Sequence, residues 1–290
     1  MNDGKRETGN VRRLSGKSLT KKAAKSENQL ADLRCKGNLP VMLRAYCRQR
    51  FRSLIIPCLL VLLTALLQRH KANFGPVLPV DLNSPAVTRL DFTANNPRVA
   101  TADLRNTTDF AVLVDELLAA QHATVGVGGY LENRVIYRRS QHFGPGAAPE
   151  ARSLHLGVDV WLPSGTPVLA PLPATIHSLA DNDNFGDYGP TVILQHELEG
   201  TVFYSLYGHL SRQEWRELRV GQRLEKGEAF ATVGPFPENG NWPAHLHFQL
   251  MADMLGLVGD FPGVAPPSER EKWAALCPDP NLVLQCGAIG

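Results

Sequence analysis

The chain has 290 residues, a length that allows one or two domains, and its formal net charge is only +2. This near-neutral total hides an uneven distribution. Residues 1–52 carry fourteen Lys and Arg against four Asp and Glu, whereas the remaining residues carry sixteen against twenty-four. The basic segment lacks the aromatic interleaving and the motifs typical of nucleic-acid binding, so we expect no nucleic-acid partner. We interpret residues 1–52 as a disordered basic tail, because they are polar and rich in Lys, Ser and Asn.

An apolar segment follows at residues 53–68. Its run from Leu54 to Leu67 contains no charged residue and is flanked by arginines, but fourteen residues are short against the ~20 that a membrane-spanning helix needs. Three interpretations stay open: a short signal-anchor, an internal signal-like segment, or a buried core helix. We expect a single-pass membrane anchor, with the N-terminus cytoplasmic because basic residues precede the run. A soluble protein is the alternative.

The next elements are predicted from composition and periodicity. Residues 69–100 are rich in Pro and Asn, which indicates a connector, and residues 101–290 are expected to form the main domain. Apolar residues recur at helical spacing within 111–121, which predicts an amphipathic helix. Residues 125–137 are predicted as a Gly-rich turn that leads into a strand. Several short strands punctuated by Gly and Pro are expected to follow, up to residue 250.

Two other segments hold weak candidate sites. The DNDN sequence within residues 181–190 begins like a calcium loop, but Phe185 stands where a ligand is required, so we interpret this segment as a rim turn that touches substrate. The five cysteines are an odd number without a CxxC motif, which does not favour a disulfide framework. Cys277 and Cys286 are the pair that would join in an oxidising compartment.

The most informative segment is residues 244–250, AHLHFQL. Strict alternation predicts a strand, with His245, His247 and Gln249 on one face. The opposite face is apolar: Leu246, Phe248 and Leu250. Two imidazoles therefore stand side by side on a rigid element, which is how proteins present nitrogen ligands to a metal ion.

Further candidate ligands precede this strand. His155 and Asp159 are four residues apart, and His209 lies at the end of a predicted strand over 201–210. Two histidine nitrogens and one carboxylate form a known protein set for catalytic zinc, which leaves a fourth position for water. Together with the two strand histidines, the chain holds two more such groups than one divalent ion needs. The surplus suits proton transfer or stabilisation of charge on an attacked carbonyl.

Five motifs, in this order, carry a family resemblance: HLGVD, SGTPVLAP, YGHLS, VGQRLEKGEAFATVG and HLHFQL. They resemble the lysostaphin/LytM-type zinc metallopeptidases of the duplicated hybrid motif fold, over about residues 154–250. The resemblance implies a mainly β fold, with a compact antiparallel β-sheet/barrel-sandwich hybrid catalytic domain after a preceding helix. It also implies that His155, Asp159 and His247 bind one Zn²⁺, with His209 and His245 as catalytic histidines.

The expected activity is therefore hydrolysis of peptide bonds, in a peptide or a peptidoglycan-like substrate, by a zinc-bound water. Zinc lowers the pKa of its bound water toward ~7, and a neutral imidazole can accept the proton. No glutamate base of the HExxH type is expected, because Gly200 stands where the second histidine of a motif begun by His196 belongs. The alternative is a catalytically silent binding or regulatory module that retains the peptidase fold. The oligomeric state stays open.

Two departures from wall-cutting family members bear on the substrate. Residues 234–243 contain extra prolines and a tryptophan before the last motif, and the sequence downstream includes GDFPGV at residues 259–264 and CPDPN at residues 277–281. These segments look most like a subgroup found fused to phosphotransferase and class III aminotransferase domains. Neither such domain is present among these 290 residues. The resemblance to this subgroup places the cell-wall substrate in doubt without altering the zinc chemistry.

Overall fold

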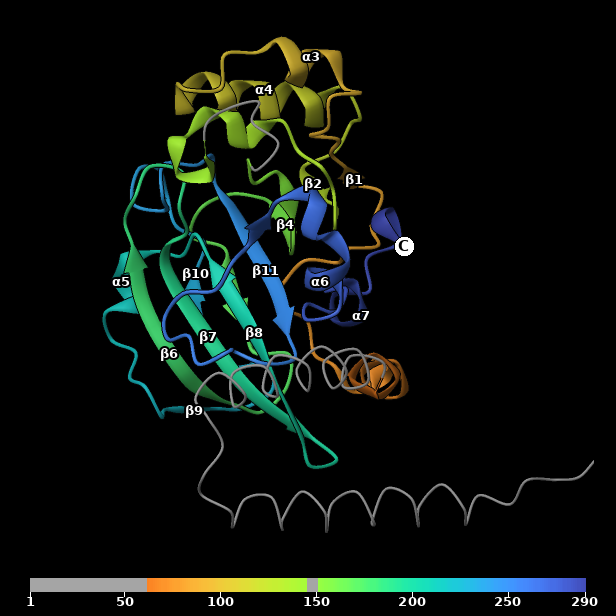
Figure 1. Ribbon diagram of the computed structural model, residues 1–290, viewed down its shortest axis with the longest axis vertical. Helices are drawn as coiled ribbons and strands as arrows, with labels where there is room; N and C mark the ends of the chain where they lie inside the picture. The colour runs from red at the N-terminus through yellow and green to blue at the C-terminus, as the bar shows by residue number, and fades with distance from the viewer. Residues whose placement is uncertain (1–61, 145–150) are drawn as a thin grey trace, which may run out of the picture. The chain divides into compact units, whose positions relative to one another are not determined.

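An eight-stranded sheet is the main layer of the structure, a computed structural model that describes residues 62–144 and 151–290 (Figure 1). The strand order is β1-β2-β4-β11-β8-β7-β6-β9. Neighbours are antiparallel apart from the parallel pair β1–β2. Two small antiparallel pairs, β10–β5 and β12–β3, complete a mainly β fold with few helices, which confirms the predicted fold class. The predicted tail, residues 1–52, lies outside the described residues.

The elements have the following bounds. The strands are β1 Val87–Arg89, β2 Val125–Gly128, β3 Leu154–His155, β4 Val158–Trp161, β5 Pro167–Leu169, β6 Ala174–Asn182, β7 Gly189–Leu198, β8 Thr201–Gly208, β9 Arg223–Leu224, β10 Ala229–Thr232, β11 His245–Met251 and β12 Val264–Ala265. The α-helices are α3 Pro97–Thr101, α4 Thr107–Ala119, α5 Arg212–Trp215, α6 Arg270–Ala274 and α7 Asn281–Leu284. Short 3₁₀ helices are η1 Lys71–Asn73, η2 Ile136–Arg139, η3 Gln141–Phe143, η4 Pro267–Glu269 and η5 Gly287–Ile289.

Strand β11 lies between β4 and β8, and its register determines which side chains meet. His247 pairs with Asp159 of β4 on one side and with Gly208 of β8 on the other, while His245 pairs with Trp161. Directly opposed residues on neighbouring strands place their side chains on the same face. The polar face of β11 is therefore matched by the acidic and aromatic side chains of β4.

The apolar face of β11 packs into the main core, as its alternation predicted. The three side chains are Leu246, Phe248 and Leu250, each at most 1% exposed. They contact a cluster that also includes Val158 and Val160 of β4 and Tyr207 of β8. One-residue alternation thus separates a dry core on one side of β11 from the histidines on the other.

Helices α3 and α4 lie together at one end of the sheet (Figure 1). The predicted helix at 111–121 is confirmed as α4, which begins four residues earlier because the Asn106 side chain caps it by accepting a hydrogen bond from the Thr108 amide. Phe110 of α4 is fully buried against Trp161, with ring centroids 5.8 Å apart. This helix therefore covers the edge of the sheet beside the polar face of β11.

The turn and the strand predicted within residues 125–137 occur in the opposite order, because the Gly-rich residues themselves form the strand. Strand β2 stops at Gly128, and residues 136–139 form the 3₁₀ helix η2. A Cβ atom at Gly128 would lie 2.3 Å from Nη2 of Arg134, so the glycine makes room for this guanidinium. The Arg134 side chain thus occupies the space that a side chain at position 128 would need.

The apolar run was predicted as a membrane anchor, with a buried core helix as one alternative. Residues 54–61 lie outside the described residues, and residues 62–69 are helical. Leu63, Leu66 and Leu67 are at most 3% exposed and belong to the main core. Among the helices of the described residues, none combines the length and the apolar character that crossing a membrane requires. Residues 62–67 therefore pack as the core-helix alternative predicts.

The segment predicted as a connector, residues 69–100, also contributes to the core. Val77 and Leu78 are almost fully buried in the main cluster, and β1 adds a parallel strand to the sheet beside β2. Cys277 and Cys286 do not form the disulfide that we considered. Both are free and buried, and they belong to different core clusters.

Candidate active site

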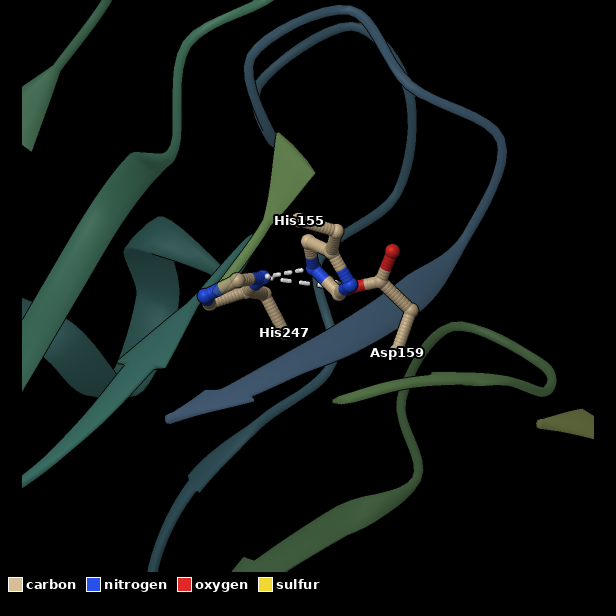
Figure 2. A group of neighbouring side chains, drawn as sticks. All are labelled: His155, Asp159 and His247. Atoms are coloured by element: carbon tan, nitrogen blue, oxygen red, sulfur yellow. Dashed lines mark hydrogen bonds and ion pairs between the residues drawn. The ribbon is translucent and has the colours of Figure 1, made fainter. Parts of the chain in front are cut away.

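Three of the predicted site residues converge on one point (Figure 2). Nε2 of His155 lies 3.0 Å from Nδ1 of His247, and Oδ1 of Asp159 lies 3.2 Å from the first nitrogen and 3.0 Å from the second. The residues come from β3, β11 and β4, and each is at most 3% exposed. The structure therefore brings together the set that the sequence predicted as metal ligands.

The outward nitrogen of each ring determines where the lone pairs point. Nδ1 of His155 lies 3.2 Å from the carbonyl of Gly129, and Nε2 of His247 lies 3.0 Å from Oε1 of Gln249. Both acceptors lack a proton, because the Gln249 amide nitrogen donates instead to the carbonyl of Pro262. Each outward nitrogen must then carry the hydrogen, so the inward nitrogens of both rings present lone pairs to each other and to a carboxylate.

Such an arrangement fits a cation. Three lone-pair atoms about 3 Å apart repel one another unless a positive charge lies between them. Ligand atoms at 2.0–2.1 Å from a tetrahedral zinc ion are separated by about 3.3 Å, close to the spacing seen here. The outward hydrogen bonds to a carbonyl and an amide are also the partners that orient metal-binding histidines. The donor set therefore suits Zn²⁺.

Gly157 is required for this geometry. A Cβ atom at this position would lie 2.6 Å from Cε1 and 2.7 Å from Nε2 of His247. Any side chain here would displace the imidazole from the cluster. The glycine in the motif HLGVD thus allows the backbone to lie close to the imidazole of His247.

Burial and neighbouring charges set the protonation of the cluster. Burial lowers the pKa of His155 to about 3, an effect that the Arg134 guanidinium reinforces. Burial alone would raise the pKa of Asp159, but the facing His155 and Arg134 hold it well below its usual range. At neutral pH this part of the site therefore holds a carboxylate and a neutral imidazole, which are the forms that bind metal.

The two remaining histidines lie beside the cluster. Ring centroids of His209 and His245 are 4.2 Å apart, and Nε2 of His245 is 4.0 Å from Oδ1 of Asp159. Nδ1 of His209 donates to the carbonyl of Asn239 at 2.8 Å, and Nδ1 of His245 donates to that of Pro243 at 2.7 Å. Both rings thus keep Nε2 unprotonated, as a proton acceptor requires.

Burial also keeps these two rings neutral. It lowers the pKa of His245 to about 4, and it lowers the pKa of His209 well below its usual range together with the neighbouring His245 and His247. His209 has a φ of 61°, in the left-handed region. Backbone hydrogen bonds to Tyr188 and Gly234 hold this strained residue at the end of β8.

A pocket of about 120 Å³ opens onto this site. His209, His245, His247 and Asp159 line its floor. Its walls are mainly aromatic: Tyr137, Phe143, Trp161, Tyr188, Trp242 and Phe261. Residues 186–188 of the predicted rim turn are part of the lining, so this segment lies where we expected substrate contact. A pocket with convergent histidines is where a binding or catalytic site is expected.

Sequence reasoning missed several residues that orient the site. Asn239 is fully buried, and its side-chain amide donates to the carbonyls of Gly234 and Trp242, which fixes the loop whose backbone binds His209. Arg134 bonds to Asp159, and Trp161 stacks on His245. The spacing of residues in the sequence does not indicate these positions, because each contacts the site only in the folded structure. Gln249 was noticed only as sharing a strand face with the histidines.

Comparison with known proteins finds similarity over the segment that holds this site. Residues 153–256 match the model of Peptidase family M23. An "Uncharacterized metalloprotease" from Haemophilus influenzae is 34% identical over 95 residues, which cover 33% of this chain and 18% of that protein. The chain thus spans less than a fifth of the length of this curated relative. The resemblance to the subgroup fused to other enzyme domains stays a prediction.

Two solved structures also show similarity to this chain. The catalytic domain of lysostaphin from Staphylococcus simulans is 28% identical, with a TM-score of 0.29 over 41% of this chain and 80% of that one. The catalytic domain of the M23 protein EnpA from Enterococcus faecalis is 21% identical, with a TM-score of 0.29 over 40% of this chain and 77% of that one.

Proposed function

We propose that the protein is a zinc-dependent metalloendopeptidase, which the match of residues 153–256 to the model of Peptidase family M23 supports. One observation carries the proposal: two imidazole nitrogens and a carboxylate oxygen, all buried, converge within 3.2 Å of one another. His155, Asp159 and His247 are the proposed ligands. Three protein ligands leave a fourth position free, which is typical of catalytic rather than structural zinc sites.

When bound, Zn²⁺ supplies an activated water and polarises the carbonyl of the peptide bond. His209 and His245 are the proposed catalytic histidines. Each keeps its Nδ1 proton on a backbone carbonyl and directs Nε2 into the pocket, so a neutral ring is ready to accept a proton. The same ring, once protonated, donates to the leaving amine.

The proposed substrate is a peptide or a peptidoglycan-like cross-bridge. The aromatic walls and the small volume of the pocket favour residues with little side chain beside the bond that is cut. A catalytically silent binding module is the alternative, and modules of that kind usually lack one or more metal ligands. All five residues are present here and lie together, which supports an active enzyme.

The test is to measure metal content and peptidase activity of the full chain. We expect about one zinc per chain and cleavage of glycine-rich peptides or of isolated peptidoglycan, abolished by a chelator and restored by zinc. Zinc binding without cleavage of any peptide would favour the binding module. Failure to bind zinc would overturn the proposal.

A further inference from the structure

Arg134 is an arginine with no contact to solvent. Its side chain is 0% exposed, and its Nη1 donates to Oδ2 of Asp159. On its other side, Nε of Arg134 donates to Oε2 of Glu132 at 2.9 Å, and the Glu132 side chain is only 3% exposed. A buried charge is costly unless it is paired, so these three groups depend on one another.

The carboxylate of Asp159 therefore has two different oxygens. Oδ1 lies against the inward nitrogens of His155 and His247, whereas Oδ2 is held by the guanidinium of Arg134. Figure 2 shows one oxygen of Asp159 turned toward the imidazoles and the other turned away. We propose that the Arg134–Glu132 pair is a positioning device that restricts Asp159 to binding the metal through one oxygen. This inference rests on the zinc site proposed above.

Glu132 gives the device its charge balance. A lone guanidinium bonded to a ligand would repel a divalent cation nearby, because charges in a buried site are weakly screened. The carboxylate of Glu132 offsets that charge while it fixes the guanidinium. Arg89 adds little, because its Nη2 is 3.5 Å from Oε1 of Glu132 and its side chain is 59% exposed.

The absence of a side chain at Gly128 leaves space for the Arg134 guanidinium. Gly128 of β2 lies opposite Asp159 of β4 in the sheet, and a Cβ atom there would lie 2.3 Å from Nη2 of Arg134. A side chain at this position would push the guanidinium off the carboxylate. Gly128 is therefore needed for Arg134 to reach Asp159 of β4.

The opposing view is that Arg134 merely fills the core. The two views differ in what happens to the metal, which can be measured without any assay of turnover. With Arg134 removed, Oδ2 of Asp159 is free to join Oδ1 on the ion. With Glu132 neutralised, Asp159 stays held, but the positive charge beside the site is no longer offset.

The experiment uses the full chain loaded with Co²⁺ for spectroscopy and titrated with Zn²⁺ against a competing chelator. We expect Arg134→Gln to weaken the visible Co²⁺ absorption, because five-coordinate cobalt absorbs less than four-coordinate cobalt. We expect Glu132→Gln to keep the wild-type spectrum and to bind zinc about tenfold more weakly, the lower end of what removal of partners of metal ligands costs.

The matched control is Arg139→Gln, which removes another buried arginine. Arg139 donates to Thr107 and does not touch Asp159, so its loss should change neither spectrum nor affinity. Wild-type spectra and affinities in both test variants would overturn the inference. If Arg134→Gln does not fold, an unchanged affinity in Glu132→Gln overturns it alone. A wild-type protein that binds no metal would instead refute the proposed function.

Discussion

The indole of Trp161 is stacked on the imidazole of His245, with ring centroids 4.1 Å apart and planes 17° from parallel. The two residues are directly opposed on β4 and β11, two positions along the antiparallel register from Asp159 and His247, with the pair Val160–Leu246 between them. The register that joins two proposed metal ligands thus also joins a proposed catalytic histidine to a flat aromatic surface. Together with the hydrogen bond to Pro243, the stack leaves the His245 ring little freedom to rotate.

The first prediction follows from this stack. Trp161→Phe should lower kcat by about tenfold to a hundredfold, because a smaller ring lets His245 turn away from the reacting group. Zinc content should not change, since Trp161 does not touch the proposed ligands through its ring. The control is Trp215→Phe, which alters a tryptophan that lies outside the pocket lining. Equal kcat values for the two variants would contradict this role.

The second prediction separates ligands from catalytic groups. His245 and His247 are two residues apart on β11 and equally buried, at 2% and 3% exposed, so they form a matched pair. His247→Ala should lose most of the zinc, as should His155→Ala and Asp159→Ala, because three protein ligands leave no redundancy. His245→Ala should keep it. Metal analysis after dialysis measures this, and full zinc occupancy in His247→Ala would refute the ligand set.

The third prediction concerns turnover. His209→Ala and His245→Ala should reduce kcat by ~10² to 10⁴, the usual contribution of a general acid or base, with zinc content unchanged. Steady-state kinetics on a peptide that the wild type cleaves measures the loss. Wild-type turnover in both variants would show that another group transfers the proton.

The fourth prediction uses a histidine remote from the site. His196 is buried, its Nε2 is 2.7 Å from Oγ of Ser205, and burial lowers its pKa from 6.5 to about 4. The unfolded chain therefore binds more protons between these values, so stability that is complete above pH 6.5 is lost as the pH falls toward 4. The full effect is about 3 kcal/mol, from 1.36 kcal/mol per pKa unit.

The measurement is the free energy of unfolding against pH by denaturant titration. His196→Gln should be less stable than the wild type at pH 7, and the difference should shrink toward pH 4 because the titrating group is gone. An identical pH dependence in wild type and His196→Gln would contradict the prediction.

The fifth prediction addresses the apolar run. Leu67 is 0% exposed in the main core, whereas Leu62 in the same helix is 61% exposed. Leu67→Ala should cost about 2–5 kcal/mol of stability, because it leaves a cavity in the core. Leu62→Ala should change stability by less than about 0.5 kcal/mol. If residues 62–67 served instead to hold a membrane, the two variants would melt alike.

Much of the site was predictable from local pattern. The alternation in residues 244–250 separates His245 and His247 from an apolar face, because a strand directs successive side chains to opposite sides. The structure confirms that separation and the mainly β fold. The motif HLGVD holds two more of the converging residues, with the glycine that His247 needs beside it. These site residues lie within a few positions of one another in the chain, so their relative placement can be predicted from residue type and spacing alone.

Other features were decided only by tertiary structure. Arg134 reaches Asp159 across 25 residues. The acceptors that set the tautomers of His155, His209 and His245 are backbone carbonyls, which every residue possesses and no motif marks. Within residues 125–137, the Gly-rich part predicted as a turn forms strand β2, and the 3₁₀ helix η2 stands where a strand was predicted to follow. The helical residues 62–67 were undecidable from hydrophobicity, because a protein core and a lipid bilayer select the same apolar side chains. Only contact with the sheet distinguishes them.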